Sequence, residues 1–477
     1  MKTLILAGGK GTRLFPLSRK KYPKQFVKFP SQESLFQQTL KRSLKISSPE
    51  DIFILTNKDY LFLIKNQIEE CCPNIWKILE KRIILEPVAR NTAPAIALAI
   101  KYLMDVENIN IEESLFITPS DHLLEPVDNF ISLIEKAKTL ATHDYLITFG
   151  IKPFRPDTGY GYIEVHNYKV NNIAFPVKKF HEKPNKTTAE MYLSKGTYYW
   201  NSGLFLFSIN AILNEFKNHA SEIYEKMVNT SYEEFLKQFI NLPEISIDYA
   251  IMEKSNKLVM VPMENIKWYD LGSWDAYYEI LPKDDKGNIF FNKENIISIE
   301  SQNCFLYSEK LLCTIGLKDI IIINTDDVLL ICKKGESQKV RDVLKILEQE
   351  NRYKNLLENR TIVFRPWGAY KELERGDRYK IKKLIIKPGE ALSLQLHHHR
   401  SEHWIVVKGT AKVVLEDEEG KLKEYYVHEN ESIFVPKSKK HRIINPGKLP
   451  LEIIEVQVGE YVEEDDIIRY DDIYNRI

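Results

Sequence analysis

The sequence predicts a chain of class α/β that continues into a small β domain and ends in an all-β barrel. Three observations lead to this prediction. Up to about Leu281, short apolar runs alternate with amphipathic helical stretches. After the charged turn at 283–288 the runs become short and strand-like, and after 365–368 the hydrophobic period changes to two. We therefore expect domains at 1–281, 282–359 and 360–477.

The first domain is expected to contain a parallel sheet covered on both faces. Five apolar runs have the composition of buried strands: 3–7, 51–56, 82–86, 114–119 and 145–150. Between them, apolar residues recur every three or four positions, which predicts helices at 33–45, 58–71, 91–104 and 128–140. Strand, helix and strand at this spacing indicate a parallel sheet, and such folds bind ligands at the carboxyl ends of the strands.

The second domain, 282–335, contains short β-like runs such as CFLYS and DIIIIN, and few ionisable side chains that could converge on a ligand. We expect a small structural β domain, of which a β-helix is one form. A helix is predicted from about Ser337, a residue suited to capping it, and a polar linker follows. From 365 onward the in-and-out alternation predicts a small antiparallel barrel or jelly roll of roughly 110 residues.

Composition excludes several classes of protein. The chain has 477 residues, and Lys plus Arg equals Asp plus Glu at 67 each, so a general nucleic-acid or membrane-surface binder is not expected. The apolar start is too short for a signal peptide, and no run approaches a membrane span, so we expect a cytoplasmic protein. Five cysteines without a C-x-x-C pair predict reduced thiols rather than disulfides or a thiolate metal site.

A glycine-rich loop, residues 8–14, follows the first strand directly. Glycines let the backbone approach a ligand closely and offer N–H groups to phosphate oxygens. The loop lacks the ending of a P-loop, and Leu14 replaces the third glycine of the dinucleotide motif. A plain strand-to-helix connection is the alternative, but two cations, Arg13 and Lys24, favour a nucleoside-triphosphate site. Asp121 lies just past the apolar run SLFIT, and Asp270 in WYDLGS could hold Mg²⁺ together with it.

The stretch 6–26, LAGGKGTRLFPLSRKKYPKQF, resembles the signature of the mannose-1-phosphate guanylyltransferases, a branch of the sugar-nucleotide pyrophosphorylases. Seven further blocks agree in order: 86–99, 118–122, 149–164, 180–185, 198–207, 246–254 and 268–276. The departures are Phe15 for Trp, His181 for an apolar residue and Asn185 for Asp. None of them removes a charged group expected to do chemistry.

The resemblance implies a Rossmann-like, GT-A-like nucleotidyltransferase domain that joins GTP to mannose 1-phosphate with Mg²⁺. The catalytic residues it implies are Arg13, Lys24, Asp121, Lys183 and Asp270. The nucleotide-binding residues are Leu6, Ala7, Gly8, Gly9, Gly11, Thr12, Arg13, Lys24, Asn91 and Thr92, and the sugar-binding residues are Gly161, Glu182, Lys183 and Asn201. A homo-oligomer is also expected.

A histidine-rich segment near the C-terminus forms the second candidate site. On a strand Gln395 and His397 share a face, Glu402 can return to it after a bend, and His441 could complete the set. Such ligands suit Zn²⁺, Mn²⁺, Fe²⁺ or Co²⁺, whereas the alternative is a polar surface strand. The spacing resembles the cupin pattern, with Gln395 for its first histidine and Ser438 where glycine is usual.

Together with RPWG at 365–368, these segments resemble the type II phosphomannose isomerase domain that is fused to a guanylyltransferase in bifunctional bacterial enzymes. This implies interconversion of mannose 6-phosphate and fructose 6-phosphate with Zn²⁺, Mn²⁺ or Co²⁺. Arg400 could neutralise an oxyanion or the sugar phosphate. The base is left open among His399, His403 and Lys380. We expect both activities to serve GDP-mannose biosynthesis; the alternatives are a guanylyltransferase with a structural cupin domain and a non-catalytic nucleotide-sugar sensor.

Overall fold

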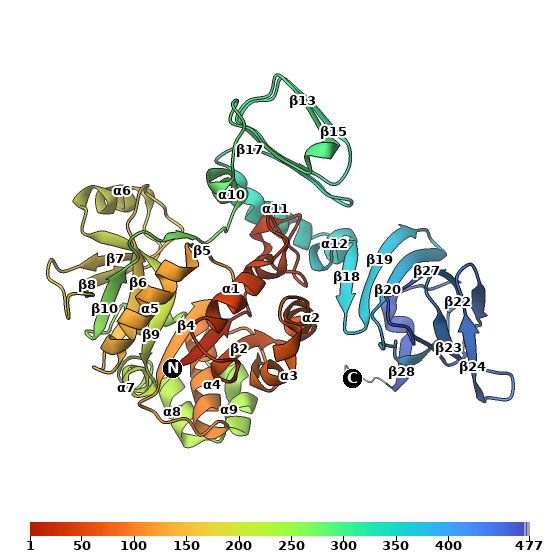
Figure 1. Ribbon diagram of the computed structural model, residues 1–477, viewed down its shortest axis with the longest axis horizontal. Helices are drawn as coiled ribbons and strands as arrows, with labels where there is room; N and C mark the ends of the chain where they lie inside the picture. The colour runs from red at the N-terminus through yellow and green to blue at the C-terminus, as the bar shows by residue number, and fades with distance from the viewer. Residues whose placement is uncertain (472–473, 475–477) are drawn as a thin grey trace. The chain divides into compact units, whose positions relative to one another are not determined.

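A computed structural model describes residues 1–471 and 474 (Figure 1). The chain divides into two compact units, Met1–Gln349 and Glu350–Ile477. Each unit is treated by itself below. In the part of the chain that is described, no helix is both long and apolar enough to cross a lipid bilayer.

A nine-stranded sheet forms the centre of the first unit, in the order β3-β2-β1-β4-β9-β6-β10-β8-β7. The strands are β1 (Lys2–Leu6), β2 (Ile52–Asn57), β3 (Ile83–Glu86), β4 (Ser114–Pro119), β6 (Leu146–Ile151), β7 (Tyr162–Val165), β8 (Phe175–His181), β9 (Tyr198–Ser208) and β10 (Leu258–Pro262). Strands β1 to β4 are parallel as predicted. The sheet as a whole is mixed, because β9 inserts antiparallel between β4 and β6.

Helices cover both faces of this sheet, since successive strand residues point to opposite sides. Ile5 and Ile54 pack toward α1 (Leu35–Leu44), α2 (Leu61–Cys71) and α3 (Trp76–Leu79). Leu4 and Leu55 pack toward α4 (Thr92–Asp105), α7 (Ile209–His219), α8 (Ser221–Asn229) and α9 (Tyr232–Gln238). Further along the sheet, α5 (Val127–Ala141) and α6 (Lys186–Lys195) share a core. The four helices expected from the sequence are thus present.

Two short strands, β5 (Leu123–Glu125) and β11 (Lys267–Tyr269), pair antiparallel and precede α10 (Trp274–Ile280). The chain then coils through β12 (Ile289–Phe291), β13 (Ile296–Ile299), β14 (Phe305–Ser308), β15 (Leu312–Ile315), β16 (Ile320–Asn324) and β17 (Leu329–Lys333). Ile289 pairs with Phe305 and Phe305 with Ile321, a constant step of 16 residues along parallel strands. This is a small parallel β-helix, and β17 closes it antiparallel.

The helix expected from Ser337 begins as a 3₁₀ turn at Ser337–Lys339 and continues as α11 (Val340–Glu348). Ser337 does not cap it. Its hydroxyl and N–H groups donate instead to the carboxylate of Asp275 in α10, 2.5 and 3.1 Å away. The polar linker that follows contains a short helix, α12 (Lys354–Glu358).

The second unit is a jelly roll of two antiparallel sheets. One sheet has the order β18-β19-β20-β27-β22-β25, and the other β24-β23-β26-β21-β28. Their bounds are β18 (Ile362–Arg365), β19 (Gly368–Arg375), β20 (Tyr379–Ile386), β21 (Leu394–His397), β22 (Arg400–Lys408), β23 (Ala411–Glu416), β24 (Leu422–Val427), β25 (Ser432–Val435), β26 (His441–Ile444), β27 (Leu451–Gly459) and β28 (Ile467–Asp471). Burial alternates along β20 and β27, as the period of two predicted.

The contact between the α/β domain and the β-helix depends on Phe29, which is 4% exposed. Its ring centroid lies 4.5 Å from that of Phe291 and 5.2 Å from that of Tyr277, with three further aromatic rings around it. Phe29→Ala should lower the free energy of unfolding of the first unit by about 3–5 kcal/mol, because the cavity has rigid walls. Urea titration followed by tryptophan fluorescence measures this loss. Leu311→Ala, which truncates an exposed side chain, is the control, and an equal loss in both variants would contradict the assignment.

Candidate active sites

The glycine loop leaves the sheet at the end of β1 and turns back onto a 3₁₀ helix at Lys24–Phe26. Gly11 has a φ of +42°, and a Cβ atom there would lie 2.8 Å from the backbone nitrogen of Lys24, so only glycine fits. The Gln25 side-chain amide donates to the Gly9 carbonyl over 2.8 Å. The loop is therefore held in a defined shape beside Lys24.

Four of the charged residues predicted from the sequence meet at this loop. The Lys24 ammonium, only 3% exposed, lies 3.0 Å from Asp121 Oδ2 and 2.7 Å from Asp270 Oδ1. Arg13 approaches Asp270 to 3.9 Å. Burial alone would lower the pKa of Lys24, but Asp121 and Asp270 outweigh it and raise this pKa. The four side chains form one compensated cluster, although their positions span residues 13 to 270.

His122 belongs to the same cluster, and the sequence argument missed it although it lies in the block at 118–122. Its Nε2 is 3.6 Å from Asp121 Oδ1, and Trp268 Nε1 donates to its Nδ1 over 3.3 Å. Burial lowers the pKa of His122, which keeps the ring neutral. One ligand atom each from Asp121, His122 and Asp270 lies within 4.8 Å of the others, a spacing that could hold a metal ion.

The predicted sugar residues also lie together. A Cβ atom on Gly161 would meet Glu182 Oε2 at 2.4 Å, and the Asn201 N–H group donates to the Gly161 carbonyl over 2.8 Å. The Asn201 amide is oriented by Thr148, which donates to its oxygen, and by Asp248, which accepts from its nitrogen over 3.1 Å. Burial, followed by the charge of Glu182, raises the pKa of Asp248 to about 7. Asp248 was missed, although it lies in the block at 246–254.

Lys183 is placed differently from the other predicted cations. Its side chain is 60% exposed and its ammonium contacts the Glu182 carboxylate, which is 9% exposed. Lys183 also has a φ of +47°, an uncommon value for a residue with a side chain. The nearby departure from the family pattern has little structural effect, because Asn185 caps α6 through a bond from the Thr188 N–H group, as Asp would.

Asn91 and Thr92 begin α4. The Asn91 side chain accepts from the Thr92 N–H group over 2.9 Å, and the Thr92 hydroxyl accepts from the backbone N–H of Ile247 over 2.8 Å. These bonds join the block at 86–99 to the block at 246–254. The two residues therefore support the loop geometry of the domain, and Asn91 itself is exposed.

Glu86, at the end of β3, is a further residue that the sequence argument passed over. It is 6% exposed, and a Cβ atom on Gly8 would lie 2.4 Å from its Oε1. Burial raises the pKa of this carboxyl to about 7. Within residues 1–471, no group donates a hydrogen bond to it. A buried acceptor of this kind, directly against the glycine loop, is suited to receive donors from a ligand.

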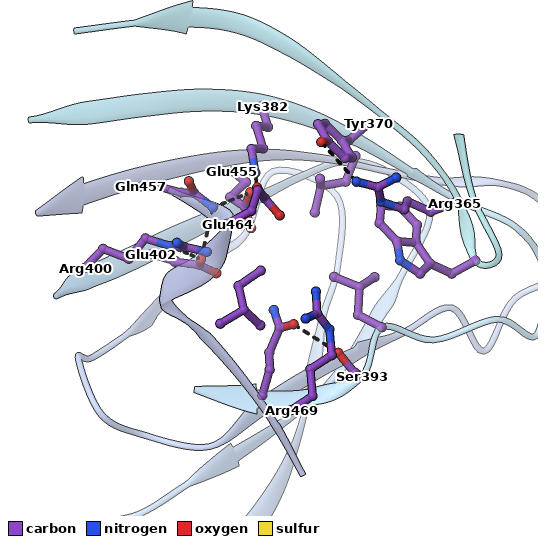
Figure 2. A pocket seen from close by; sticks show the side chains of 15 residues that line it. Arg365, Tyr370, Lys382, Ser393, Arg400, Glu402, Glu455, Gln457, Glu464 and Arg469 are labelled. Carbon is purple, nitrogen blue, oxygen red and sulfur yellow. Dashed lines mark hydrogen bonds and ion pairs between the residues drawn. The ribbon is translucent and has the colours of Figure 1, made fainter. Parts of the chain in front are cut away.

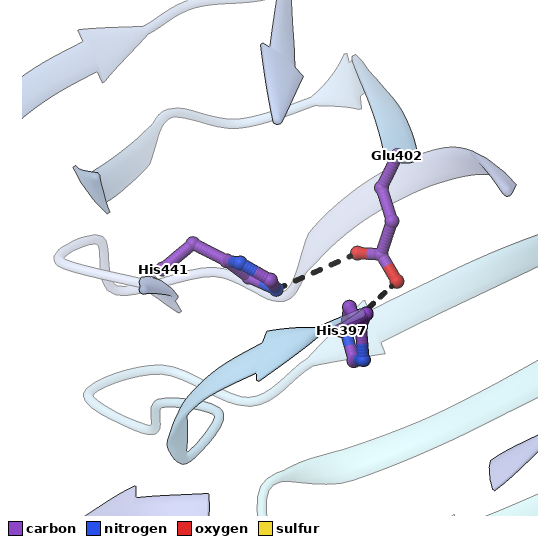
Figure 3. A group of neighbouring side chains, drawn as sticks. All are labelled: His397, Glu402 and His441. Carbon is purple, nitrogen blue, oxygen red and sulfur yellow. Dashed lines mark ion pairs between the residues drawn. The ribbon is translucent and has the colours of Figure 1, made fainter. Parts of the chain in front are cut away.

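In the second unit, Glu402 lies between His397 and His441 (Figure 3). Its carboxylate oxygens are 3.1 Å from His397 Nε2 and 3.8 Å from His441 Nε2. All three residues are at most 2% exposed, and one ligand atom from each lies within 4.8 Å of the others. The structure thus brings together three of the four predicted ligands as a possible metal site.

Two nitrogen atoms show that these residues fit a metal ion. His441 Nδ1 lies 2.9 Å from the Lys439 carbonyl and can donate to it, which leaves the lone pair on Nε2 available. His441 Nε2 and His397 Nδ1 are both buried without a hydrogen-bond partner among the described residues. Unsatisfied buried polar atoms are rare in folded proteins and call for an explanation. A cation held by the imidazoles and the Glu402 carboxylate would explain the unpartnered His441 Nε2, which lies 3.8 Å from that carboxylate.

The fourth predicted ligand, Gln395, is 8% exposed and pairs with His441 in the β21–β26 register. Its side-chain oxygen accepts from the Ser393 hydroxyl over 3.0 Å. Ser438 has a φ of +60°, which explains why glycine is usual there, and its N–H group donates to the His397 carbonyl over 2.7 Å. The serine therefore adopts a left-handed conformation and contacts the His397 backbone directly.

Arg400 is 2% exposed, and its guanidinium donates to Glu402 Oε1 over 3.1 Å and to the Glu463 carbonyl over 2.7 Å. The side chain of Gln457 also donates to the Glu402 carboxylate over 3.1 Å (Figure 2). Trp404 Nε1 donates to the same carboxylate over 3.1 Å. Burial would raise the pKa of Glu402, but His397, His441 and Arg400 hold it well below its usual range. Glu402 is therefore a fixed carboxylate.

None of the three predicted bases lines the pocket beside Glu402. His403 is exposed and bonds to Ser432, because on β22 it points to the side opposite Glu402. His399 pairs with Asp466, and the Lys380 ammonium donates to the Val462 carbonyl. The charged and amide side chains that line the pocket and were missed are Arg365, Lys382, Glu455, Gln457, Glu464 and Arg469. Strand alternation could have identified Lys382, Glu455 and Gln457, because they lie on the buried faces of β20 and β27.

Three family models match the chain in order: Nucleotidyl transferase over 2–287, MannoseP isomerase/GMP-like beta-helix domain over 294–347 and Mannose-6-phosphate isomerase C-terminal over 352–472. A mannose-1-phosphate guanylyltransferase of Escherichia coli K12 is 38% identical, and the alignment covers 99% of this chain and 98% of that protein. The chain belongs to the mannose-1-phosphate guanylyltransferase family. The present chain also carries the isomerase domain. The predicted fold class and the predicted bifunctional family are therefore confirmed.

Two further comparisons agree with this family assignment. The alginate biosynthesis protein AlgA of Pseudomonas aeruginosa is 39% identical over 100% of this chain and 97% of that protein. A crystal structure from Thermus thermophilus, described as a mannose-1-phosphate geranyltransferase, matches with a TM-score of 0.64 and 28% identity. That match covers 73% of this chain and 99% of the other.

The position of Lys24 leads to a prediction for metal binding. Its ammonium lies between the same two carboxylates that could bind a cation, so Lys24→Met should lower the dissociation constant for Mn²⁺ by about tenfold or more in the absence of nucleotide. Equilibrium dialysis measures this affinity. Both proteins carry Glu402→Gln, so that the second cluster contributes little binding. Lys28→Met, which removes an ammonium paired with Glu70 outside the cluster, is the control. Equal affinities for Lys24→Met and its parent would contradict the prediction.

Proposed function

We propose that the chain is a bifunctional enzyme of GDP-mannose biosynthesis. Its first unit joins GTP to mannose 1-phosphate with release of pyrophosphate, and its second unit interconverts mannose 6-phosphate and fructose 6-phosphate. One observation carries this proposal: two separate charged clusters, each with a spacing that could hold a metal ion, lie in the two units that match the two enzyme families.

The transferase reaction needs positioning and charge neutralisation more than a strong base, because the sugar phosphate is already an anion. Arg13 and Lys24 would neutralise the triphosphate beside the glycine loop. Asp121 and Asp270 would hold Mg²⁺, which supplies charge stabilisation on the phosphate oxygens when bound. Lys24 then exchanges its carboxylate partners for phosphate oxygens. The cluster seen in the structure supports each of these roles.

The sugar would bind along the Gly161–Asn201 edge. The Glu182 carboxylate and the Asn201 amide are placed to bind sugar hydroxyl groups, and the missing side chain of Gly161 leaves room for them. Lys183 would bind the sugar phosphate. Its ammonium is exposed and, among the described residues, is held only by Glu182, so it can turn toward an incoming anion at little cost.

Glu86 would select guanine. Guanine presents two neighbouring donors, its N1–H and N2–H₂ groups, which a carboxylate can accept together, whereas adenine has no donor at N1. The buried Glu86 carboxylate has no protein donor within residues 1–471 and lies against Gly8 of the nucleotide loop. Because this acceptor is unsatisfied, Glu86 should prefer a ligand with two neighbouring donors.

The isomerase reaction would take place beside His397, Glu402 and His441, with Gln395 as the fourth ligand. A bound Zn²⁺, Mn²⁺ or Co²⁺ ion would act as a Lewis acid on the sugar oxygens at C1 and C2. Arg400 and Gln457 hold the Glu402 carboxylate in place. The buried, unpartnered imidazole nitrogens favour this role over a purely structural cupin domain, which would have no reason to leave them unsatisfied.

The two activities should be separable by substitution. Asp121→Asn should lower pyrophosphate release from GTP and mannose 1-phosphate by about 100-fold or more, because a ligand of the phosphate-bound cation is lost. Glu402→Gln should lower isomerase turnover and bound metal, measured by a coupled assay and by elemental analysis. Each variant should retain the other activity. Asp128→Asn and Glu418→Gln, whose side chains are 87% and 94% exposed, are the controls. Wild-type protein that lacks either activity with metal supplied would overturn that half of the proposal.

Base selection has its own test. Glu86→Gln should lower kcat/KM for GTP by about tenfold to a hundredfold, because a charged acceptor for two donors is lost. Inosine triphosphate lacks the 2-amino group, so its kcat/KM should fall less and the ratio of the two substrates should approach one. Glu80→Gln, at an exposed position in the same segment, should leave the ratio unchanged. An unchanged GTP to inosine triphosphate ratio in Glu86→Gln would exclude this role.

A further inference from the structure

The pocket beside Glu402 contains more positive charge than is required to compensate the Glu402 carboxylate. Its lining includes four cations, Arg365, Lys382, Arg400 and Arg469, in addition to Gln395 and Glu402. Figure 2 shows Arg400 and Glu402 at one side of the pocket and Arg365 at the other, with Arg469 directed toward the space between them. The cations therefore extend across the pocket, away from the histidine cluster.

Carboxylates of the lining contact part of this positive charge. Arg400 is bonded to Glu402, and the Lys382 ammonium forms an ion pair with Glu464. The third lining carboxyl, Glu455, is 4% exposed and accepts from Trp404 Nε1 over 3.2 Å and from Gln457 Nε2 over 3.0 Å. The four lining cations therefore outnumber the three lining carboxylates even when every carboxyl is ionised.

Arg365 is held only weakly by the protein. Its guanidinium donates to the Phe364 carbonyl over 3.4 Å and to the Tyr370 hydroxyl over 3.5 Å, both long bonds to neutral acceptors. It also lies 5.4 Å from the centre of the Tyr370 ring. No carboxylate among residues 1–471 forms an ion pair with it. Most of the hydrogen-bonding capacity of this guanidinium remains available to a ligand.

The backbone places Arg365 firmly even though its head group is free to bind. Arg365 ends β18 and pairs with Gly368, which begins β19, across a tight turn. Gly368 has a φ of +146°, and a Cβ atom there would lie 2.0 Å from the Ile385 carbonyl oxygen. Only glycine fits, so the RPWG turn fixes the start of the Arg365 side chain against β20. The close packing at Gly368 is a physical reason for the RPWG motif, whose role the sequence alone did not indicate.

Glu464 shows that this region stabilises a negative charge. Its side chain is 43% exposed. Burial of its carboxyl would raise its pKa, but Lys382, Arg400 and Arg365 outweigh that effect and lower the pKa to about 2. A ligand phosphate near Arg365 would meet the same favourable potential.

We propose that Arg365 and Arg469 form the subsite for the phosphate group of the hexose 6-phosphate, on the side of the pocket away from Arg400 and Glu402. The inference rests on the proposed isomerase function. The reacting carbons C1 and C2 lie near the metal cluster, and the phosphate on C6 is at the opposite end of the same sugar. Two guanidinium groups match the charge and the oxygen geometry of a phosphate dianion.

Arg365→Gln and Arg469→Gln test the subsite through steady-state isomerase kinetics with the full-length, metal-loaded enzyme. Each should raise KM for mannose 6-phosphate by about tenfold or more through the loss of a charge-assisted bond, whereas kcat should change by less than about threefold. Inorganic phosphate should inhibit the wild-type enzyme competitively, and its inhibition constant should rise in the same variants. Arg365→Lys, which keeps the charge without the fork, should recover part of the affinity.

Arg442→Gln is the matched control, because Arg442 lies on β26 in the same sheet as Arg469, bonds to Asp471 and does not line the pocket. Metal content and thermal unfolding of each variant identify any loss of fold. Unchanged KM and phosphate inhibition in both variants, with an active wild type, would overturn the subsite. A fall in kcat with unchanged KM would also overturn it. Absence of isomerase activity in the metal-supplied wild type would overturn the proposed function instead, so the two failures are distinguishable.

Discussion

Burial of the Lys24 ammonium between Asp121 and Asp270 is the interaction on which the first site depends. A buried cation is costly unless opposite charges lie against it, and here two carboxylates from distant segments supply them at 3.0 and 2.7 Å. This requirement holds the glycine loop, the end of β4 and the segment before α10 in one arrangement. The same cluster can bind a triphosphate and a divalent cation. The triphosphate can replace the carboxylates beside Lys24, and the divalent cation can replace Lys24 beside the carboxylates.

The jelly roll also compensates a buried charge, but there the buried charge is negative. Its buried charge is the Glu402 carboxylate, and Arg400, Trp404 and Gln457 donate to it. Each of the two histidines beside it retains a buried nitrogen without a hydrogen-bond partner among the described residues, and this distinguishes a site that binds a cation from a structural polar network. Positive charge in excess of the lining carboxylates then continues along the pocket to Arg365, which suits a substrate that is itself an anion.

Much of the fold could be predicted from the sequence because its local patterns are strong. Periodicity located β1 to β4 and the helices between them, and the change to a period of two located the jelly roll. The mixed character of the large sheet could not be predicted in this way. Strand β9 pairs with β4 and β6, which are distant in the chain. An apolar run in the sequence does not indicate which strands it will pair with. The charged residues that form the two candidate metal clusters were named, apart from His122. Glu86, Asp248 and the charged pocket residues Arg365, Lys382, Glu455, Glu464 and Arg469 were missed, because their significance lies in burial and in neighbours distant along the chain.

By itself, the sequence determined the order of the three structural regions, the family and the residue types available for chemistry, since these depend on composition, period and motif spacing. Only the tertiary structure decided which of those residues meet. It joined Arg13, Lys24, Asp121 and Asp270, directed His403 away from the pocket and placed Arg365 and Glu455 at its lining. The reason is physical: the pKa of a group and the cost of leaving it unpaired depend on burial and neighbours in space, which the order of residues along the chain does not contain.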